Sequence, residues 1–360
     1  MLESKYYDEY TQIKYINGGW GDTMEYTMGT NMEIISIDMN SIKKLCEVNE
    51  YKGQQIIYKK QPKVIIEQMM DKAIVEFVYD AYIDEFNGDR ETLLKLIKNE
   101  ITPNSRENIG VIEFRDVIKT INSAYEDIQI SSKTILELHG YLHRYSLKSG
   151  GMYRNIVLTD LDLDYEKSEI YMEDKIKTLC EKYYNLLKEN KVQDLIIIAC
   201  FIIDFISISP FDKDNLAMTK ILTLLLLNKN GYEIGKFTSL GKLYNDENYS
   251  YFKTLFNKQQ SIEGNTYSIN KWLDYFLSFL LSAYENLNKE MSLTTNKKET
   301  KTKRIEKVIN STLGYFTKDD VRDQCPDIPE PTINRVFDNL RKNGKIEVIA
   351  KGRSAKWKKK

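Results

Sequence analysis

Two apolar segments separated by a short polar stretch most constrain the fold of this chain. Residues 195–208 read LIIIACFIIDFISI and residues 215–229 read NLAMTKILTLLLLNK, with SPFDKD between them. A helix that is apolar on all sides is buried in a protein core or crosses a membrane. The first segment carries Asp204 and has about 14 residues, whereas a membrane span needs roughly 20. We therefore predict two buried helices, with a candidate site in the polar stretch between them.

Helical periodicity extends over most of the preceding and following sequence. Apolar residues recur three and four positions apart, as a helix with one buried face requires, in residues 63–86, 113–128, 131–146, 173–190 and 269–291. Strand-like alternation is almost absent from the first 290 residues. Residues 1–60 are poorly defined, and the glycines of 17–29 indicate turns without the Lys-Ser/Thr pair of a phosphate loop. The pattern predicts a mostly α fold with a helical domain over 61–291.

The C-terminal part of the chain has a different pattern. Residues 292–303, SLTTNKKETKTK, lack apolar anchors and are predicted to be a linker. Three short amphipathic helices follow; Thr317 begins the second of them as an N-cap with Asp320 three residues later, and Pro331 lies in the first turn of the third. Gly344 ends the third helix, and two short strands follow it. This order predicts a small α+β domain of the winged-helix type over 304–360.

Charge is concentrated in this last domain. Residues 301–360 contain 16 Lys and Arg against 8 Asp and Glu, although the whole chain has a net charge of −1. In a winged helix the third helix enters the major groove and the turn between the strands meets phosphates. The residues predicted to contact DNA are Thr332, Asn334, Arg335, Lys342, Lys351, Arg353 and Lys356. The alternative is that the domain docks another protein and that its lysines are solvated.

The composition limits the other kinds of site. The four cysteines lie far apart without metal-ligand spacing, and the only histidines are His139 and His143, so we expect no metal site and a structural role for both histidines. The chain begins MLESKYYDEY, which is not a secretion signal, and we expect a cytoplasmic protein that does not contact a membrane.

The polar stretch and its flanks resemble the Fic (Fido) family. That family carries a His-Pro-Phe-x-Asp/Glu-Gly-Asn-Gly-Arg-x-x-Arg loop between two buried helices. The segments that carry the resemblance are ILELHGYLHRYSLKSGGMYRN (135–155), FIIDFISISPF (201–211), ILTLLLLNKNGYEIGKFTSLGKLY (221–244), WLDYFLSFLLSAY (272–284) and GRSAKW (352–357). The resemblance implies a helical domain that transfers AMP from ATP, with Mg²⁺, to a protein hydroxyl, followed by a winged helix. It also implies a possible homodimer.

The loop departs from the family pattern at the positions that carry the chemistry. Ser209 stands at the position of the catalytic His, Lys213 at that of the metal-holding acid, and Asp214 and Leu216 replace the two glycines. Ala217 and Lys220 replace the arginines. Two like charges at ~4 Å repel by about 4 kcal/mol at an effective dielectric of 20, so Asp214 opposes phosphate binding. We therefore expect a pseudoenzyme with no catalytic residue, no cofactor and a vestigial nucleotide loop of Pro210, Phe211, Asp212, Lys213, Asp214, Asn215 and Lys220.

Three further readings depend on the resemblance. Many relatives carry an inhibitory helix, and its counterpart would be residues 78–90, with Tyr79, Asp84 and Glu85 at the motif positions. Enzyme activity through a rearranged loop that uses Asp212, with ATP and Mg²⁺, is the alternative to a pseudoenzyme. A third reading keeps the loop as an anion sensor. The expected partner is DNA or another protein.

Overall fold

The structure is a computed structural model that describes residues 37–84, 86–144, 150–154, 165–258, 262–296, 300–312, 314–350, 352 and 355–359. The turns predicted within 17–29 lie outside this part of the chain. The chain divides into two compact units, which are described separately. The larger unit comprises residues 1–53 and 72–284, and the smaller unit comprises residues 54–71 and 285–360. The smaller unit therefore includes residues 285–291, which the sequence placed in the helical domain.

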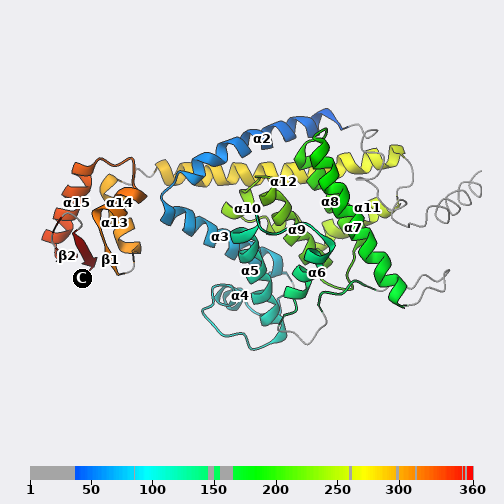
Figure 1. Ribbon diagram of the computed structural model, residues 1–360, viewed down its shortest axis with the longest axis horizontal. Helices are drawn as coiled ribbons and strands as arrows, with labels where there is room; N and C mark the ends of the chain where they lie inside the picture. Colours follow the sequence, from blue (N-terminus) through cyan, green and yellow to red (C-terminus); the bar gives the residue numbers. More distant parts are fainter. Residues whose placement is uncertain are drawn as a thin grey trace, which may run out of the picture. The chain divides into compact units, whose positions relative to one another are not determined.

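All the regular elements among the described residues of the larger unit are helices (Figure 1). Three helices, α2, α3 and α12, contribute residues to both units. The helices in chain order are α2 Met39–Lys59, α3 Lys63–Tyr82, α4 Arg90–Ile97, α5 Arg106–Ala124, α6 Ser132–Tyr141, α7 Tyr165–Glu189, α8 Asp194–Ile208, α9 Asn215–Lys229, α10 Ile234–Phe237, the 3-10 helix η2 Gly241–Leu243, α11 Asp246–Lys258 and α12 Ile262–Asn296. The predicted mostly α fold class is confirmed.

Helices α8 and α9 form the core of the larger unit. Every residue of α8 except Asp194 and Ser207 is buried, and α9 is buried from Met218 to Asn228. Helix α8 packs against α7, α9 and α11, and the Trp272 indole of α12 donates a hydrogen bond of 2.8 Å to the Ala199 carbonyl oxygen. The prediction of two buried helices is confirmed, and the polar stretch is the loop that joins them.

Helix α2 lies along α12 (Figure 1) and was not predicted. The Asn40 amide donates a hydrogen bond of 2.7 Å to the Asp274 carboxylate, and the Lys44 ammonium pairs with the same carboxylate. Ile42, Ile56 and Ile57 of α2 are exposed, so the helix lacks the single continuous apolar face that sequence periodicity detects. Helix α12 extends to Asn296, which is inside the predicted linker.

The C-terminal part of the smaller unit combines three helices with a three-stranded antiparallel sheet of order β1-β3-β2. Its elements are α13 Lys301–Ser311, β1 Tyr315–Phe316, α14 Lys318–Gln324, α15 Glu330–Lys342, β2 Ile346–Ala350 and β3 Lys356–Lys359. Phe316, Phe337 and Trp357 meet in its buried core. The predicted capping of α14 is present, because Thr317 and Asp320 exchange side-chain and backbone hydrogen bonds.

Among the described residues, none of the helices has both the length and the apolar character that crossing a membrane would require.

Packing around Gly241 gives a test of the larger unit. A methyl group at Gly241 would lie 2.6 Å from the Phe77 carbonyl oxygen and 2.8 Å from the Asp80 β-carbon, whereas one at Gly53 would meet nothing within 4 Å. We expect Gly241→Ala to lower the free energy of unfolding by about 1–3 kcal/mol because backbone must move. Gly53→Ala, inside α2, should raise it by roughly 0.5–1 kcal/mol. Urea denaturation followed by circular dichroism measures both, and equal effects would contradict the packing described.

Candidate functional site

The loop between α8 and α9 holds two non-glycine residues in left-handed backbone conformations. Ser209 ends α8 with φ 43°, and Asp214 precedes α9 with φ 62°. Residues other than glycine seldom adopt positive φ, although Asp tolerates it better than most. Asp214 stands at a glycine position of the resembled signature. The loop therefore keeps a turn that favours glycine while it carries a carboxylate there.

Asn215 fastens this loop from the first residue of α9. Its side-chain oxygen accepts a hydrogen bond of 3.0 Å from the Phe211 backbone N–H, and its side-chain nitrogen donates one of 2.6 Å to the Phe211 carbonyl oxygen. A buried backbone group needs such partners, because an unpaired one is costly. These two hydrogen bonds give Asn215 a structural role in the loop.

Ser209, at the position of the family's histidine, is only 2% exposed. Its hydroxyl donates a hydrogen bond of 2.7 Å to the Ile206 carbonyl oxygen and lies 3.1 Å from the Tyr249 hydroxyl. Burial raises the pKa of Tyr249 above its usual value, so the phenol stays protonated near neutral pH. Neither hydroxyl is a base under these conditions.

His139 packs face to face on Phe211, with ring centroids 3.8 Å apart and an interplanar angle of 8°. Its Nδ1 accepts a hydrogen bond of 3.0 Å from the Gly151 backbone N–H. Burial lowers the pKa of His139 to about 4, and repulsion from His143 adds to the effect. The ring is therefore neutral at pH 7, and its proton lies on Nε2, because Nδ1 is the acceptor.

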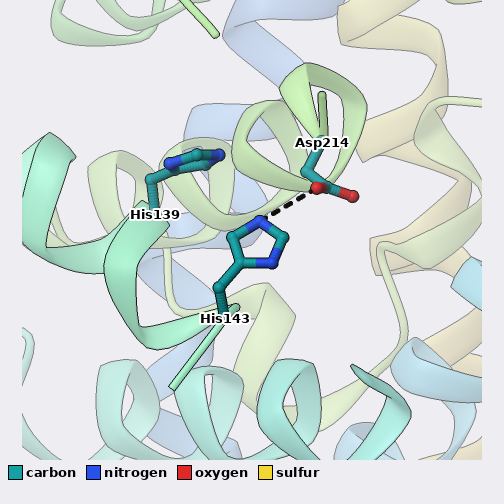
Figure 2. Close-up of side chains that lie close together, drawn as sticks. All are labelled: His139, His143 and Asp214. Carbon is teal, nitrogen blue, oxygen red and sulfur yellow. Dashed lines mark ion pairs between the residues drawn. The ribbon is translucent and has the colours of Figure 1, made fainter. Parts of the chain in front are cut away.

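The His143 imidazole contacts the Asp214 carboxylate. The distance between His143 Nε2 and Asp214 Oδ2 is 3.1 Å, and Figure 2 shows His139 next to His143 and facing the same carboxylate. The sequence placed both histidines on one helix; this is wrong for His143, because α6 ends at Tyr141 and His143 lies in the turn that follows. The pair holds a carboxylate at the N-terminus of α9, which is the end of a helix that attracts anions.

The other predicted loop residues differ in exposure. Asp212 and Lys213 are exposed, whereas Lys220, on α9, and Pro210 are buried.

Arg154, which was not predicted, fixes the start of the loop. Its backbone N–H donates a hydrogen bond of 2.8 Å to the Pro210 carbonyl oxygen, and its guanidinium donates one of 3.1 Å to the Ile208 carbonyl oxygen. The sequence signal that could have identified Arg154 is its position directly after GGMY in the segment that resembles the Fic family.

The proposed counterpart of the inhibitory helix is only partly helical. Tyr79 lies on α3, but α3 ends at Tyr82 and Asp84 lies in the turn beyond it. The prediction of one helix over 63–86 is therefore wrong at its end. Glu85 lies outside the described residues.

The residues predicted to contact DNA come from α15 and β3. Thr332, Asn334, Arg335 and Lys342 lie on α15, where Arg335 and Lys342 are exposed, and Lys356 begins β3 and is also exposed. The Asn334 side-chain oxygen accepts a hydrogen bond of 2.6 Å from Lys318. Lys351 and Arg353 lie outside the described residues.

The two-sided contact of Asn215 predicts a structural phenotype. Asn215→Ala leaves the buried Phe211 N–H and carbonyl without partners, and we expect it to lower the free energy of unfolding by about 1–3 kcal/mol. Asp212→Ala, three residues away and exposed, should change it by less than about 0.5 kcal/mol. Chemical denaturation of both variants checks this. An Asn215→Ala protein as stable as Asp212→Ala would show that the loop does not depend on this side chain.

Comparison with solved structures identifies the fold of the chain. No protein-family model matches the chain, and no curated protein has a significantly similar sequence. Among solved structures, a Fic family protein from Desulfovibrio desulfuricans G20 matches with a TM-score of 0.54 and 14% identity over 90% of this chain and 97% of its own.

Two further structures agree with it. A Fic domain containing signaling protein from Bacteroides thetaiotaomicron VPI-5482 matches with a TM-score of 0.51 and 12% identity, over 72% of this chain and 100% of its own. Fic-1 from C. elegans, residues 134–508, matches with a TM-score of 0.54 and 16% identity, over 71% of this chain and 73% of its own. The chain therefore has the fold of the Fic-family proteins.

Proposed function

We propose that this protein is a Fic-fold pseudoenzyme that does not transfer AMP. It would regulate transcription by binding DNA through its C-terminal domain. The observation that carries the first part is the His143–Asp214 pair at the N-terminus of α9. It puts a negative charge where the resembled signature places the glycines that approach phosphates. A phosphate at this helix end would meet that carboxylate at close range, and like charges repel.

The candidates for a general base also argue against AMP transfer. A base must hold a free lone pair within hydrogen-bond reach of the attacking hydroxyl. Ser209 is buried and is not basic near neutral pH, and the lone pair of His139 Nδ1 is taken by the Gly151 N–H. The loss of acid–base assistance alone slows a reaction by about 10²–10⁴-fold.

A second candidate function is nucleotide transfer by a rearranged loop. The observation that favours it is the same His143–Asp214 contact, because a carboxylate that orients an imidazole is the arrangement found in many general bases. His143 would then act in place of the missing histidine. This candidate and the pseudoenzyme give opposite results in a transfer assay.

The proposal of DNA binding rests on the C-terminal domain. Its order of helix, strand, two helices and two strands is that of a winged helix, with α15 as the helix that enters the major groove. Among the described residues, neither Arg335 nor Lys342 of α15 forms an ion pair, whereas Arg341 pairs with Asp338 at 3.8 Å. Arg335 and Lys342 are therefore available to neutralise phosphates.

We expect no transfer of label from α-³²P-ATP to this protein or to lysate proteins, with Mg²⁺ or Mn²⁺, because Ser209 is not basic, His139 Nδ1 already accepts from Gly151 and His143 Nε2 contacts Asp214. A Fic enzyme with an intact signature serves as the positive control. Label that appears with the wild type and disappears with His143→Gln would instead establish the second candidate.

We expect the full chain to bind a mixed-sequence DNA duplex at low salt, with an affinity that falls steeply as salt rises, because phosphate contacts release counterions. Fluorescence anisotropy at several salt concentrations measures the slope of log K against log salt. Replacing Arg335 and Lys342 together by Ala should reduce that slope by about 2, or roughly 1 per phosphate contact.

The matched control for DNA binding replaces Lys119 and Lys133, two exposed lysines of the larger unit, by Ala and changes the net charge equally. An unchanged slope is expected for it. If the control and the α15 variant behave alike, or if the wild type fails to bind at low salt, α15 is not a DNA-binding helix.

A further inference from the structure

We propose that His139, His143 and Asp214 form a binding site for one divalent first-row transition-metal ion, for which Zn²⁺ is the probe. The ligand atoms of these three side chains all lie within 4.8 Å of one another (Figure 2). The two histidines are the only ones in the chain. The site goes beyond the proposed function and does not depend on it.

The geometry is close to that of a metal centre. Zn²⁺ binds nitrogen and carboxylate oxygen at about 2.0–2.2 Å, so two ligands of one tetrahedral ion lie roughly 3.3 Å apart. His143 Nε2 and Asp214 Oδ2 already lie 3.1 Å apart. The wider separations within the 4.8 Å cluster must close by about 1.5 Å, which a rotation of the Asp214 side chain, 40% exposed, permits; the His143 side chain is only 10% exposed.

A second observation, independent of this spacing, points to a ligand. His139 is only 5% exposed, and its Nε2 is buried without a hydrogen bond of normal geometry among the described residues, although the Lys213 backbone lies close enough to the ring to favour its protonated form. Figure 2 shows this nitrogen directed toward Asp214. A buried polar atom without a partner is uncommon in proteins and calls for a missing ligand or water.

Coordination by His139 requires its proton to change place. Nδ1 now accepts from the Gly151 N–H, so the proton lies on Nε2. A metal on Nε2 needs that lone pair, and the proton then moves to Nδ1 with no net release. Nδ1–H in turn needs an acceptor, the kind of second contact that metal-bound histidines make.

The Gly150–Gly151 peptide can supply that acceptor. A flip of this peptide replaces the Gly151 N–H by the Gly150 carbonyl oxygen, and two adjacent glycines allow it because glycine adopts either sign of φ. Gly151 now has φ +74°. A side chain at Gly150 would meet the His143 β-carbon at 2.8 Å, so only glycine lets the chain pass here.

The donor set selects a transition metal. Two imidazoles and one carboxylate suit Zn²⁺, Fe²⁺, Co²⁺ or Ni²⁺, whereas Mg²⁺ and Ca²⁺ prefer oxygen ligands. Three protein ligands leave at least one coordination position open. The Asp214 side chain is 40% exposed, so an ion can enter from solvent past it.

The test is Zn²⁺ titration of the full chain by calorimetry, in a Cys46→Ser background because the exposed Cys46 thiol is a competing ligand. We expect one Zn²⁺ per chain. Asp214→Gly removes a ligand while glycine suits its φ of 62°, and it should weaken binding at least about 10-fold, as should His143→Gln. Asp212→Asn, an exposed carboxylate outside the cluster, is the matched control and should stay within about 2-fold of the background protein.

A second readout separates this site from binding elsewhere. In ¹⁵N spectra of the histidine rings, Zn²⁺ should move the His139 proton from Nε2 to Nδ1. Absence of Zn²⁺ binding, equal affinity in Asp214→Gly, an equal loss in Asp212→Asn or an unchanged His139 spectrum would each overturn the proposal.

Discussion

The structure around the candidate site depends on how the chain passes from one wholly buried helix to another. Helices α8 and α9 have almost no polar face, so the loop between them must satisfy its own backbone groups inside the protein. Side chains of Asn215 and Arg154 form hydrogen bonds with these backbone groups, and the Phe211 ring stacks on both His139 and Tyr153. These contacts keep the Fic-type turn in place without the residues that serve catalysis in the resembled signature.

The same scaffold explains what stands at the N-terminus of α9. A helix end of this kind attracts an anion, and here the anion is the chain's own Asp214 carboxylate, held by His143. The neutral, buried His139 completes the group. A carboxylate at this position favours a cation over a triphosphate, so Asp214 is common to the proposed absence of AMP transfer and to the proposed metal site.

Some of these structural features were predictable from the sequence and others were not, depending on whether their physical cause is local in the chain. The bounds of α8 and α9 were predictable because continuous apolar runs leave few alternatives, and Thr317 and Gly344 marked their helix ends because capping and positive φ are local. Helix α2 was not predicted because its exposed isoleucines obscure the helical periodicity of its apolar residues. Strand β1 was not predicted because it has only two residues, which pair with the distant β3. The contact of His143 with Asp214 was not predictable either, since it joins residues far apart in the chain through the packing of α6 on the loop.

We infer that this Fic-fold loop does not hold a nucleotide, because Asp214 occupies the N-terminal end of α9, where a phosphate would bind. Isothermal titration of the full chain with ATP and Mg²⁺ tests it most directly. We expect no measurable heat of binding for the wild type. Tight binding of ATP that requires Mg²⁺ would contradict it.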